Sequence, residues 1–500
     1  MNILRRLRVT LAAVFFTLIT LLFLDFTGTL HTWLSWLANI QFLPALMALN
    51  VAVIVALVLL TLLFGRIYCS VVCPLGVLQD IVSWISGRRK KKKFRFSYSA
   101  EKRLLRYGVL ALFIVAFIAG IGSLVAMLAP YSSYGRIAQN IFQPIYIFGN
   151  NLMAWAAERV DSYAIYNREV WLRSLPTFFI ATITLIGTGI LAWRNGRTYC
   201  NTICPVGTIL SLLARFSWFK VKVDETKCNK CGLCSHSCKS ACIDFKNSKI
   251  DYSRCVVCGD CIDKCRKKAL SYTHSSLMKA EKTDKIDEEV VNSARRSFLL
   301  GVAIATTSAV MAQEKKKVDG GLAEIEDKQA PERKTPLTPP GSLSAENMAR
   351  HCTACQLCVA ECPNDVLRPS ADIMKLMQPT MSYERGYCRP ECNRCSEVCP
   401  AGAIKPIKRE DKSSIQIGHA VWIKKNCVPI TDGKECGNCA RHCPAGAITM
   451  ISSNPKDDTS PKIPAVNTSR CIGCGACENL CPARPFSAIY VEGHEVHRYI

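Results

Sequence analysis

Cysteines at short, regular intervals are the residues of this sequence that most directly indicate a chemistry. The chain has 29 cysteines, and nearly all recur two or three residues apart, too close for the disulfide framework of a small secreted protein. Three thiolates on one tight loop reach three irons of a cubane cluster. The spacing therefore predicts iron-sulfur centres, whose chemistry is the transfer of single electrons.

Two quartets in the middle of the chain have the C-x2-C-x2-C-x3-C spacing of bacterial two-cluster ferredoxins. In such domains the fourth cysteine of each quartet ligates the cluster of the other quartet. Lys239 and Arg266 replace the proline that usually follows, and we interpret Cys242 as a packing residue beside a cluster. The predicted ligand sets are Cys228, Cys231, Cys234 and Cys265, and Cys255, Cys258, Cys261 and Cys238.

The last part of the chain contains four more quartets, each of which ends with Cys-Pro. The same exchange of fourth ligands predicts four more clusters, so six 4Fe-4S clusters are expected in all. Zinc is the alternative metal, but closely spaced cysteines followed by Cys-Pro favour cubanes. The predicted sets are Cys352, Cys355, Cys358 and Cys399; Cys388, Cys392, Cys395 and Cys362; Cys427, Cys436, Cys439 and Cys481; and Cys471, Cys474, Cys477 and Cys443.

A different cysteine motif occurs twice near the N-terminus, within the repeated pattern G-R-x-Y-C-x3-C-P-x-G that begins at Gly65 and at Gly196. Cysteines four residues apart share one face of a helix, so the two motifs are able to converge. Buried packing cysteines explain the motif equally well, because C-x3-C alone is a weak metal signal. The candidates for this further site are Cys69, Cys73, Cys200 and Cys204.

Four apolar segments must position these repeats, and they predict an α-helical membrane domain. The segments, each about the length that crosses a hydrocarbon core, are residues 9–26, 41–64, 104–128 and 171–193. Bacterial ferredoxin-like α+β domains are expected on both sides of the membrane. The connection between the third and fourth segments is predicted to be an external loop that contains Tyr131, Tyr134, Arg136 and Gln143.

The charge pattern orients these segments. The net charge is +24, and the densest basic run, residues 88–95, lies between the second and third apolar segments. Nucleic-acid binding is one explanation of a basic chain, but basic residues between two spans retain a loop in the cytoplasm. We therefore expect a multi-pass protein of the inner membrane, with its N-terminus inside and no nucleic-acid partner.

Residues 293–313 divide the cysteine-rich halves. Arg295, Arg296, Phe298 and Leu299 reproduce the RRxFL core of a twin-arginine export signal. An ordinary membrane anchor with positive-inside arginines is the alternative. Either interpretation places the C-terminal domain outside the cytoplasm, in the periplasm. Cleavage after Ala312 is left open.

With these motifs in this order, residues 1 to about 275 resemble the NapH-type membrane ferredoxins, and residues from about 293 resemble the NapG/MauM-type exported ferredoxins. The resemblance implies a quinol dehydrogenase that passes electrons from the (mena)quinol pool to a periplasmic redox partner, such as a nitrate reductase-type system. A related pair serves methylamine dehydrogenase systems. An assembly or metal-reducing maturation factor is the alternative function.

Quinol oxidation needs proton acceptors near the outer face of the membrane. Asp25 and His31 are the candidates, because ionisable groups at membrane depth are costly and often functional. Ordinary helix-end residues are the alternative interpretation of both. The expected domains are a four-span domain at residues 1–215, a cytoplasmic two-cluster domain at 222–272, a linker at 273–292, the signal or fifth span at 293–313, a flexible linker at 314–344 and the exported four-cluster domain at 345–500.

Overall fold

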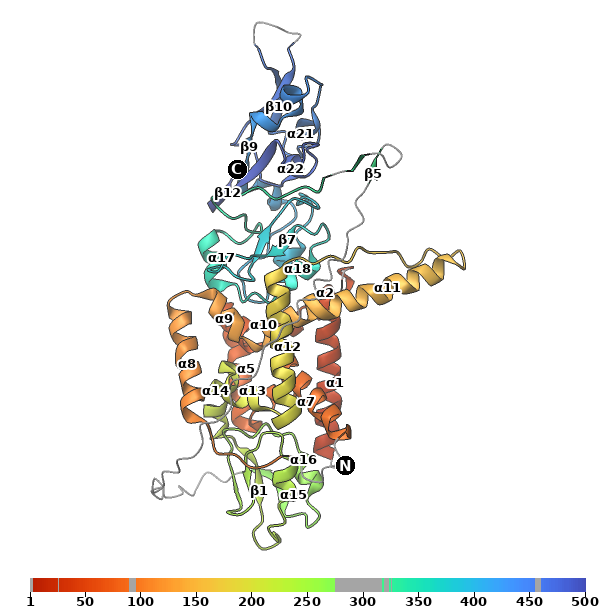
Figure 1. Ribbon diagram of the computed structural model, residues 1–500. Coiled ribbons are helices and arrows are strands. Elements are labelled where there is room, and N and C mark those ends of the chain that lie inside the picture. Colours follow the sequence, from red (N-terminus) through yellow and green to blue (C-terminus); the bar gives the residue numbers. More distant parts are fainter. Residues whose placement is uncertain are drawn as a thin grey trace, which may run out of the picture.

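The computed structural model describes residues 3–25, 27–89, 96–274, 317–318, 323–324, 326–454 and 460–500. The predicted export segment at residues 293–313 and most of the basic run at 88–95 lie outside these ranges. The molecule is elongated (Figure 1). A helical bundle, residues 3–216, lies between a middle domain, residues 217–274, and a C-terminal domain, residues 326–500.

Two helices of the bundle are long and apolar enough to cross a membrane. They are α1 (Ile3–Leu24) and α12 (Leu175–Asn195), with mean hydropathies of 2.3 and 1.9. The other two predicted spans are each broken into two shorter helices. These pairs are α4 (Phe42–Met47) with α5 (Val51–Phe64), and α8 (Arg103–Ile118) with α9 (Gly122–Leu128). The four-span arrangement therefore stays a prediction.

Backbone conformation explains the two breaks. Leu49 and Gly120 have positive φ angles of 53° and 71°, which an α-helix does not accommodate. After the first break, the Asn50 side chain accepts a hydrogen bond from the backbone N–H of Val53 and caps α5. Each of these two apolar segments thus forms two shorter helices instead of one continuous span.

Part of the predicted external loop after the third apolar segment is a buried helix, and the side of the membrane on which it lies stays a prediction. This helix, α10 (Pro130–Ile137), starts with a proline that suits the first helical turn, and all of its residues are buried. It continues through a π-helical turn, η1 (Ala138–Phe142), into α11 (Gln143–Glu158). The aromatic rings of Tyr131 and Tyr134 pack 5.6 and 6.2 Å from that of Phe23 on α1.

The two repeats have the same local fold. A short helix carries the first cysteine, and the Cys-Pro step then starts a second helix, because proline is favoured at the first helical position. Six further helices form the bundle's repeats and connections. They are α6 (Tyr68–Val71) with α7 (Pro74–Arg89), α13 (Thr198–Thr202) with α14 (Pro205–Ala214), and α2 (Thr29–Leu34) with α3 (Trp36–Asn39).

The middle and C-terminal domains consist of short helices and two-stranded antiparallel sheets. In the middle domain β1 (Phe219–Val223) pairs with β4 (Leu270–His274), and β2 (Ile243–Asp244) with β3 (Lys249–Ile250). The C-terminal sheets are β7 (Leu367–Pro369) with β8 (Pro379–Met381), β9 (Ile415–Trp422) with β12 (Ile489–Tyr499), and β10 (Ile448–Ser452) with β11 (Lys462–Val466). One buried core runs from the bundle into the C-terminal domain.

Candidate iron-sulfur sites

The structure brings together each cysteine set that the spacing predicts, and we number the sets by their position along the molecule. In the middle domain, each of two separate cavities is lined by four cysteines drawn from both quartets, and Cys242 also lines the second. Each short helix there, α15 (Leu233–Ser237) and α16 (Asp260–Lys264), follows a glycine with positive φ. Set 1 is Cys228, Cys231, Cys234 and Cys265, and set 2 is Cys238, Cys255, Cys258 and Cys261.

The C-terminal domain groups its cysteines in the same way. Cys399 lies beside the first three cysteines of the domain, and Cys362 lies beside Cys388 and Cys395. Two further cavities are each lined by four cysteines. The sets are set 4, Cys352, Cys355, Cys358 and Cys399; set 5, Cys362, Cys388, Cys392 and Cys395; set 6, Cys443, Cys471, Cys474 and Cys477; and set 7, Cys427, Cys436, Cys439 and Cys481.

The separation between cysteine sulfurs favours a multi-iron centre over a single zinc ion. Zinc-sulfur bonds of about 2.3 Å place the sulfurs of a tetrahedral zinc site roughly 3.8 Å apart. Within the described ranges, the groups whose three or more ligand atoms lie within 4.8 Å of one another include no cysteine. The sets are therefore wider than a single ion requires, as the larger cubane needs.

Burial disfavours the thiolate form of these cysteines when no metal is bound. Burial raises the pKa of Cys474 to about 12 and that of Cys355 to about 11. Four thiolates within one such pocket need nearby positive charge, which iron supplies. The donor chemistry of the sets thus fits iron-sulfur clusters.

The two N-terminal repeats form a further site, set 3, from Cys69, Cys73, Cys200 and Cys204, all of which are buried. The repeats meet with approximate twofold symmetry. Arg197 Nη1 donates to the carbonyl of Cys69 at 2.6 Å, and Arg66 Nη2 donates to the carbonyl of Cys200 at 3.2 Å. In addition, Gln79 Nε2 lies 3.2 Å from the Cys200 sulfur. Convergent sulfurs with N–H donors around them are suited to holding a metal centre.

Set 3 is in direct contact with the middle domain. Arg66 Nη1 donates to the carbonyl of Ser253 at 3.0 Å, and the backbone N–H of Arg197 donates to the carbonyl of Lys239 at 2.9 Å. Ser253 and Lys239 adjoin the loops that carry the cysteines of set 2. The same two arginines therefore connect set 3 with set 2.

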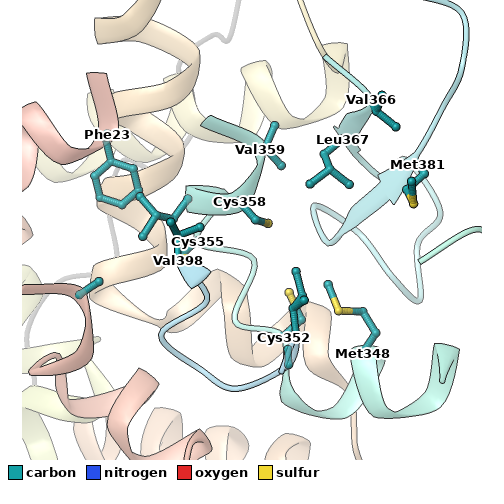
Figure 2. Packing of buried hydrophobic residues seen from close by; sticks show 14 of the residues in the cluster. Phe23, Met348, Cys352, Cys355, Cys358, Val359, Val366, Leu367, Met381 and Val398 are labelled. Carbon is teal, nitrogen blue, oxygen red and sulfur yellow. The ribbon is translucent and has the colours of Figure 1, made fainter. Parts of the chain in front are cut away.

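On its other side, set 3 approaches the C-terminal domain through α10. Tyr131 belongs to the same buried hydrophobic cluster as Tyr68, which precedes Cys69, and Cys355 of set 4. Gly135 packs so closely on the backbone of Cys355 that an added Cβ would lie 2.3 Å from its carbonyl oxygen. Figure 2 shows Phe23 of the bundle next to Cys355 and Val398. A buried helix thus fills the space between the two cysteine sets.

The comparisons with known proteins agree with this chemistry. A family model described as a 4Fe-4S binding domain matches residues 46–93 and 175–224, which contain both halves of set 3. A second model, a 4Fe-4S dicluster domain, matches residues 434–484. The methylamine utilization ferredoxin-type protein MauM of Methylobacillus flagellatus is 31% identical over 166 residues, 32% of this chain and 70% of MauM. The chain belongs to this ferredoxin-type iron-sulfur family.

Other members of the ferredoxin-type family match different shares of their own length. MauN of Methylobacillus flagellatus is 26% identical over 178 residues, and the chain spans about half of it, 49%. The ferredoxin-type protein NapF of Escherichia coli is 25% identical over 161 residues, 32% of this chain and 87% of NapF. No solved structure matches. The protein is thus an iron-sulfur electron-transfer protein homologous to the Mau and Nap ferredoxins.

The two predicted proton acceptors lie together just after the C-terminal end of α1. Asp25 and His31 are both buried, and the His31 ring also contacts Glu361 of the C-terminal domain. Their role in quinol oxidation stays a prediction. Sequence reasoning missed Glu361, because its only local signal is its position one residue before Cys362. It also missed Gly135 and Tyr131, whose partners are distant in the sequence.

Proposed function

We propose that the protein is a membrane quinol dehydrogenase that delivers electrons to a redox partner protein in the periplasm, such as a nitrate reductase-type system. Sets 1, 2 and 4 to 7 would hold 4Fe-4S clusters and set 3 a further centre, which when bound carry electrons singly. One observation carries the proposal: hydrogen bonds of Arg66 link the domain of set 2 to set 3, and the buried helix α10 packs between set 3 and set 4. Set 6 then meets set 5, where the Cys388 N–H donates to the Cys474 carbonyl at 2.9 Å.

A cavity beside set 4 is suited to the quinol headgroup. It has a volume of about 330 Å³ and is lined by the π-helical turn, by residues 166–173 and by the C-terminal domain. Asn140 Nδ2 donates to Gln356 Oε1 at 3.0 Å, and the buried Gln356 Nε2 has no hydrogen-bond partner among the described residues. Gln356 directly follows Cys355. A quinol hydroxyl in the cavity would therefore find an amide donor next to a cluster ligand.

Helix α11 offers a route from the lipid to this cavity. It projects sideways from the bundle (Figure 1), and a stripe of its side chains is at least half exposed. The stripe is Ile145, Phe148, Leu152 and Trp155. Apolar residues at this spacing are typical of a helix that lies in a membrane interface. Oxidation of each quinol to quinone releases two electrons toward set 4 and two protons to the outer water.

The test is anaerobic reduction of the purified full chain by a menaquinol analogue, followed by cluster absorbance. We expect Asn140→Leu to slow this reduction at least tenfold, while reduction by dithionite stays normal. Asn247→Leu, at an exposed turn of the middle domain, is the matched control. Equal rates in all three proteins would reject the cavity, and no reduction of wild type by quinol would reject the proposed function.

The contact between sets 2 and 3 favours a second source of electrons, a reduced carrier in the cytoplasm. A soluble ferredoxin that reduces the chain in the absence of quinol would support this source.

If the protein were instead an assembly factor, the result would differ, because electron flow through the partner enzyme would persist while the partner lacked its metal.

A further inference from the structure

Three side chains able to bind a metal ion meet where the bundle joins the C-terminal domain. Asp25 follows α1, His31 lies on α2, and Glu361 ends α18 (Leu357–Glu361). One ligand atom from each lies within 4.8 Å of the other two. The three residues are 6%, 4% and 4% exposed. No cysteine belongs to this group, so it is separate from the predicted cluster sites.

The geometry of the three side chains suits a shared ion. His31 Nδ1 lies 2.7 Å from Glu361 Oε2 and 3.5 Å from Asp25 Oδ2. Ligands bound at 2.0 to 2.2 Å around one tetrahedral ion lie roughly 3.3 to 3.6 Å apart, so the separation of His31 from Asp25 already fits, and His31 and Glu361 would move apart slightly when an ion binds. Despite the short distance, neither ring nitrogen of His31 nor Glu361 Oε2 has a hydrogen-bond partner with acceptable angles. These buried atoms therefore lie close enough together to be ligands of one ion.

Backbone hydrogen bonds hold the first ligand in place. Asp25 Oδ1 accepts from the N–H groups of Thr27 and Gly28, and Oδ2 accepts from that of Leu30 at 2.8 Å. The carboxylate is thus oriented before any ion binds. One neutral imidazole and two carboxylates balance the charge of a divalent cation, and this donor set suits zinc, manganese or ferrous ions.

We propose that Asp25, His31 and Glu361 bind one divalent transition-metal ion that fastens the C-terminal domain to the bundle. Glu361 lies between Cys358 of set 4 and Cys362 of set 5, so the ion would fix both sets relative to α1. Next to it, Arg394 Nη1 donates to the carbonyl of Thr27 at 3.2 Å and lies 3.6 Å from Glu361 Oε1, so a positive charge adjoins the site. Metal binding excludes the proton-accepting role predicted for Asp25 and His31, because it occupies their lone pairs.

The first test measures Mn²⁺ binding by the full chain with its clusters in place, after chelation of divalent ions. Mn²⁺ is the probe because it prefers nitrogen and oxygen ligands to thiolates. We expect one Mn²⁺ per chain, seen as loss of the free-ion EPR signal, with Zn²⁺ as a competitor. His31→Asn and Glu361→Gln should each weaken binding at least about 100-fold.

Matched controls are His351→Asn and Glu346→Gln, which remove the same side chains elsewhere and should leave Mn²⁺ binding unchanged. The iron content of each variant reports whether it folds. Iron-replete wild type that binds no Mn²⁺, or equal binding by His31→Asn, would overturn the proposal. The three residues would then form an ion triad around a protonated imidazole.

A second test addresses the fastening itself. A protease site introduced within residues 275–316 allows the full chain to be cut after purification, and release of the C-terminal fragment is then timed. Mn²⁺ should slow release at least tenfold in wild type and in Glu346→Gln, but have no effect in Glu361→Gln. Identical release with and without Mn²⁺ in wild type would overturn the fastening role.

Discussion

At the scale of single residues, Cys242 has a role beyond the packing that its sequence position suggested. Its sulfur lies 3.5 Å from that of Cys238 in set 2. The hydrogen bond with Cys242 holds the pKa of the Cys238 thiol below its ordinary value. Cys242 is therefore placed to donate to a ligand sulfur, and such hydrogen bonds help to set the reduction potential of a cluster.

We predict that Cys242→Ala keeps the full iron content but lowers the reduction potential of the centre at set 2. The lost S–H donor would otherwise stabilise the more negative, reduced state. Cys242→Ser retains a donor and should show a smaller shift. Potentiometric EPR titration measures both, and an unchanged potential in Cys242→Ala would exclude the hydrogen-bonding role.

For the cysteines of set 3 we expect a loss of iron, in contrast to Cys242. If set 3 holds a cubane, Cys204→Ser should lose about four irons per chain. Iron analysis of the purified protein checks this, with Cys242→Ala as the control that keeps all iron. Equal iron in the two variants would mean that Cys204 and its neighbours are packing cysteines.

How far sequence predicted the sites depends on how local their residues are. The cysteines of a cluster recur within a few positions, so their spacing suggests the grouping that the structure brings together. Glu361 and Gly135 act through partners in the other half of the chain. No local pattern marks such partners, because the contact exists only after the domains pack.

At the scale of elements, helix α10 occupies a stretch for which the sequence predicted an external loop and no helix. Arg136, which that prediction placed in the loop, is fully buried in α10. The guanidinium is partly satisfied within the bundle, because Nη1 donates to the carbonyl of Ala126 at 2.9 Å and Nη2 to Ser133 Oγ at 3.1 Å, whereas Nε has no hydrogen-bond partner among the described residues. Burial of a polar segment therefore depended on acceptors that only the fold provides.

We predict that Gly135→Ala loosens the joint between α10 and set 4. The new methyl group would clash with the carbonyl of Cys355, and overpacking of this kind costs about 1–3 kcal/mol. The melting temperature and the rate at which quinol reduces the clusters should both decrease. Gly149→Ala on α11 is the control, since no atom lies within 4 Å of its added Cβ; equal behaviour of the two variants would contradict the tight joint.

Asp80 on α7 forms ion pairs with residues of α1, of the segment before α13 and of the middle domain. Its carboxylate contacts Arg8 at 2.8 Å, Arg197 at 2.8 Å and Lys239 at 3.2 Å. Asp80→Asn leaves these buried cations without their anion, which costs about 3–5 kcal/mol. We expect a lower melting temperature and release of the middle domain to proteases, whereas the exposed Asp161→Asn should match wild type. A stable Asp80→Asn protein would show that the ion network is dispensable.

At the scale of the whole molecule, sequence divided the chain into a membrane domain and two cysteine-rich domains but did not show how they touch. The sequence left a hydrocarbon core about 30 Å thick between the two groups of clusters. In the structure, set 3 and α10 occupy the space between sets 2 and 4. This arrangement depends on contacts between domains, which composition and hydrophobic periodicity do not predict.

The most direct test is electron transfer across a sealed vesicle that contains the protein and no quinone. A membrane-impermeant reductant is added on the side of the middle domain, and impermeant ferricyanide is trapped on the side of the C-terminal domain. Wild type should reduce the trapped ferricyanide, and Cys204→Ser should slow this at least tenfold while both outer groups of clusters remain reducible. Transfer at equal rates in the two proteins, or none in wild type, would contradict a continuous path through set 3.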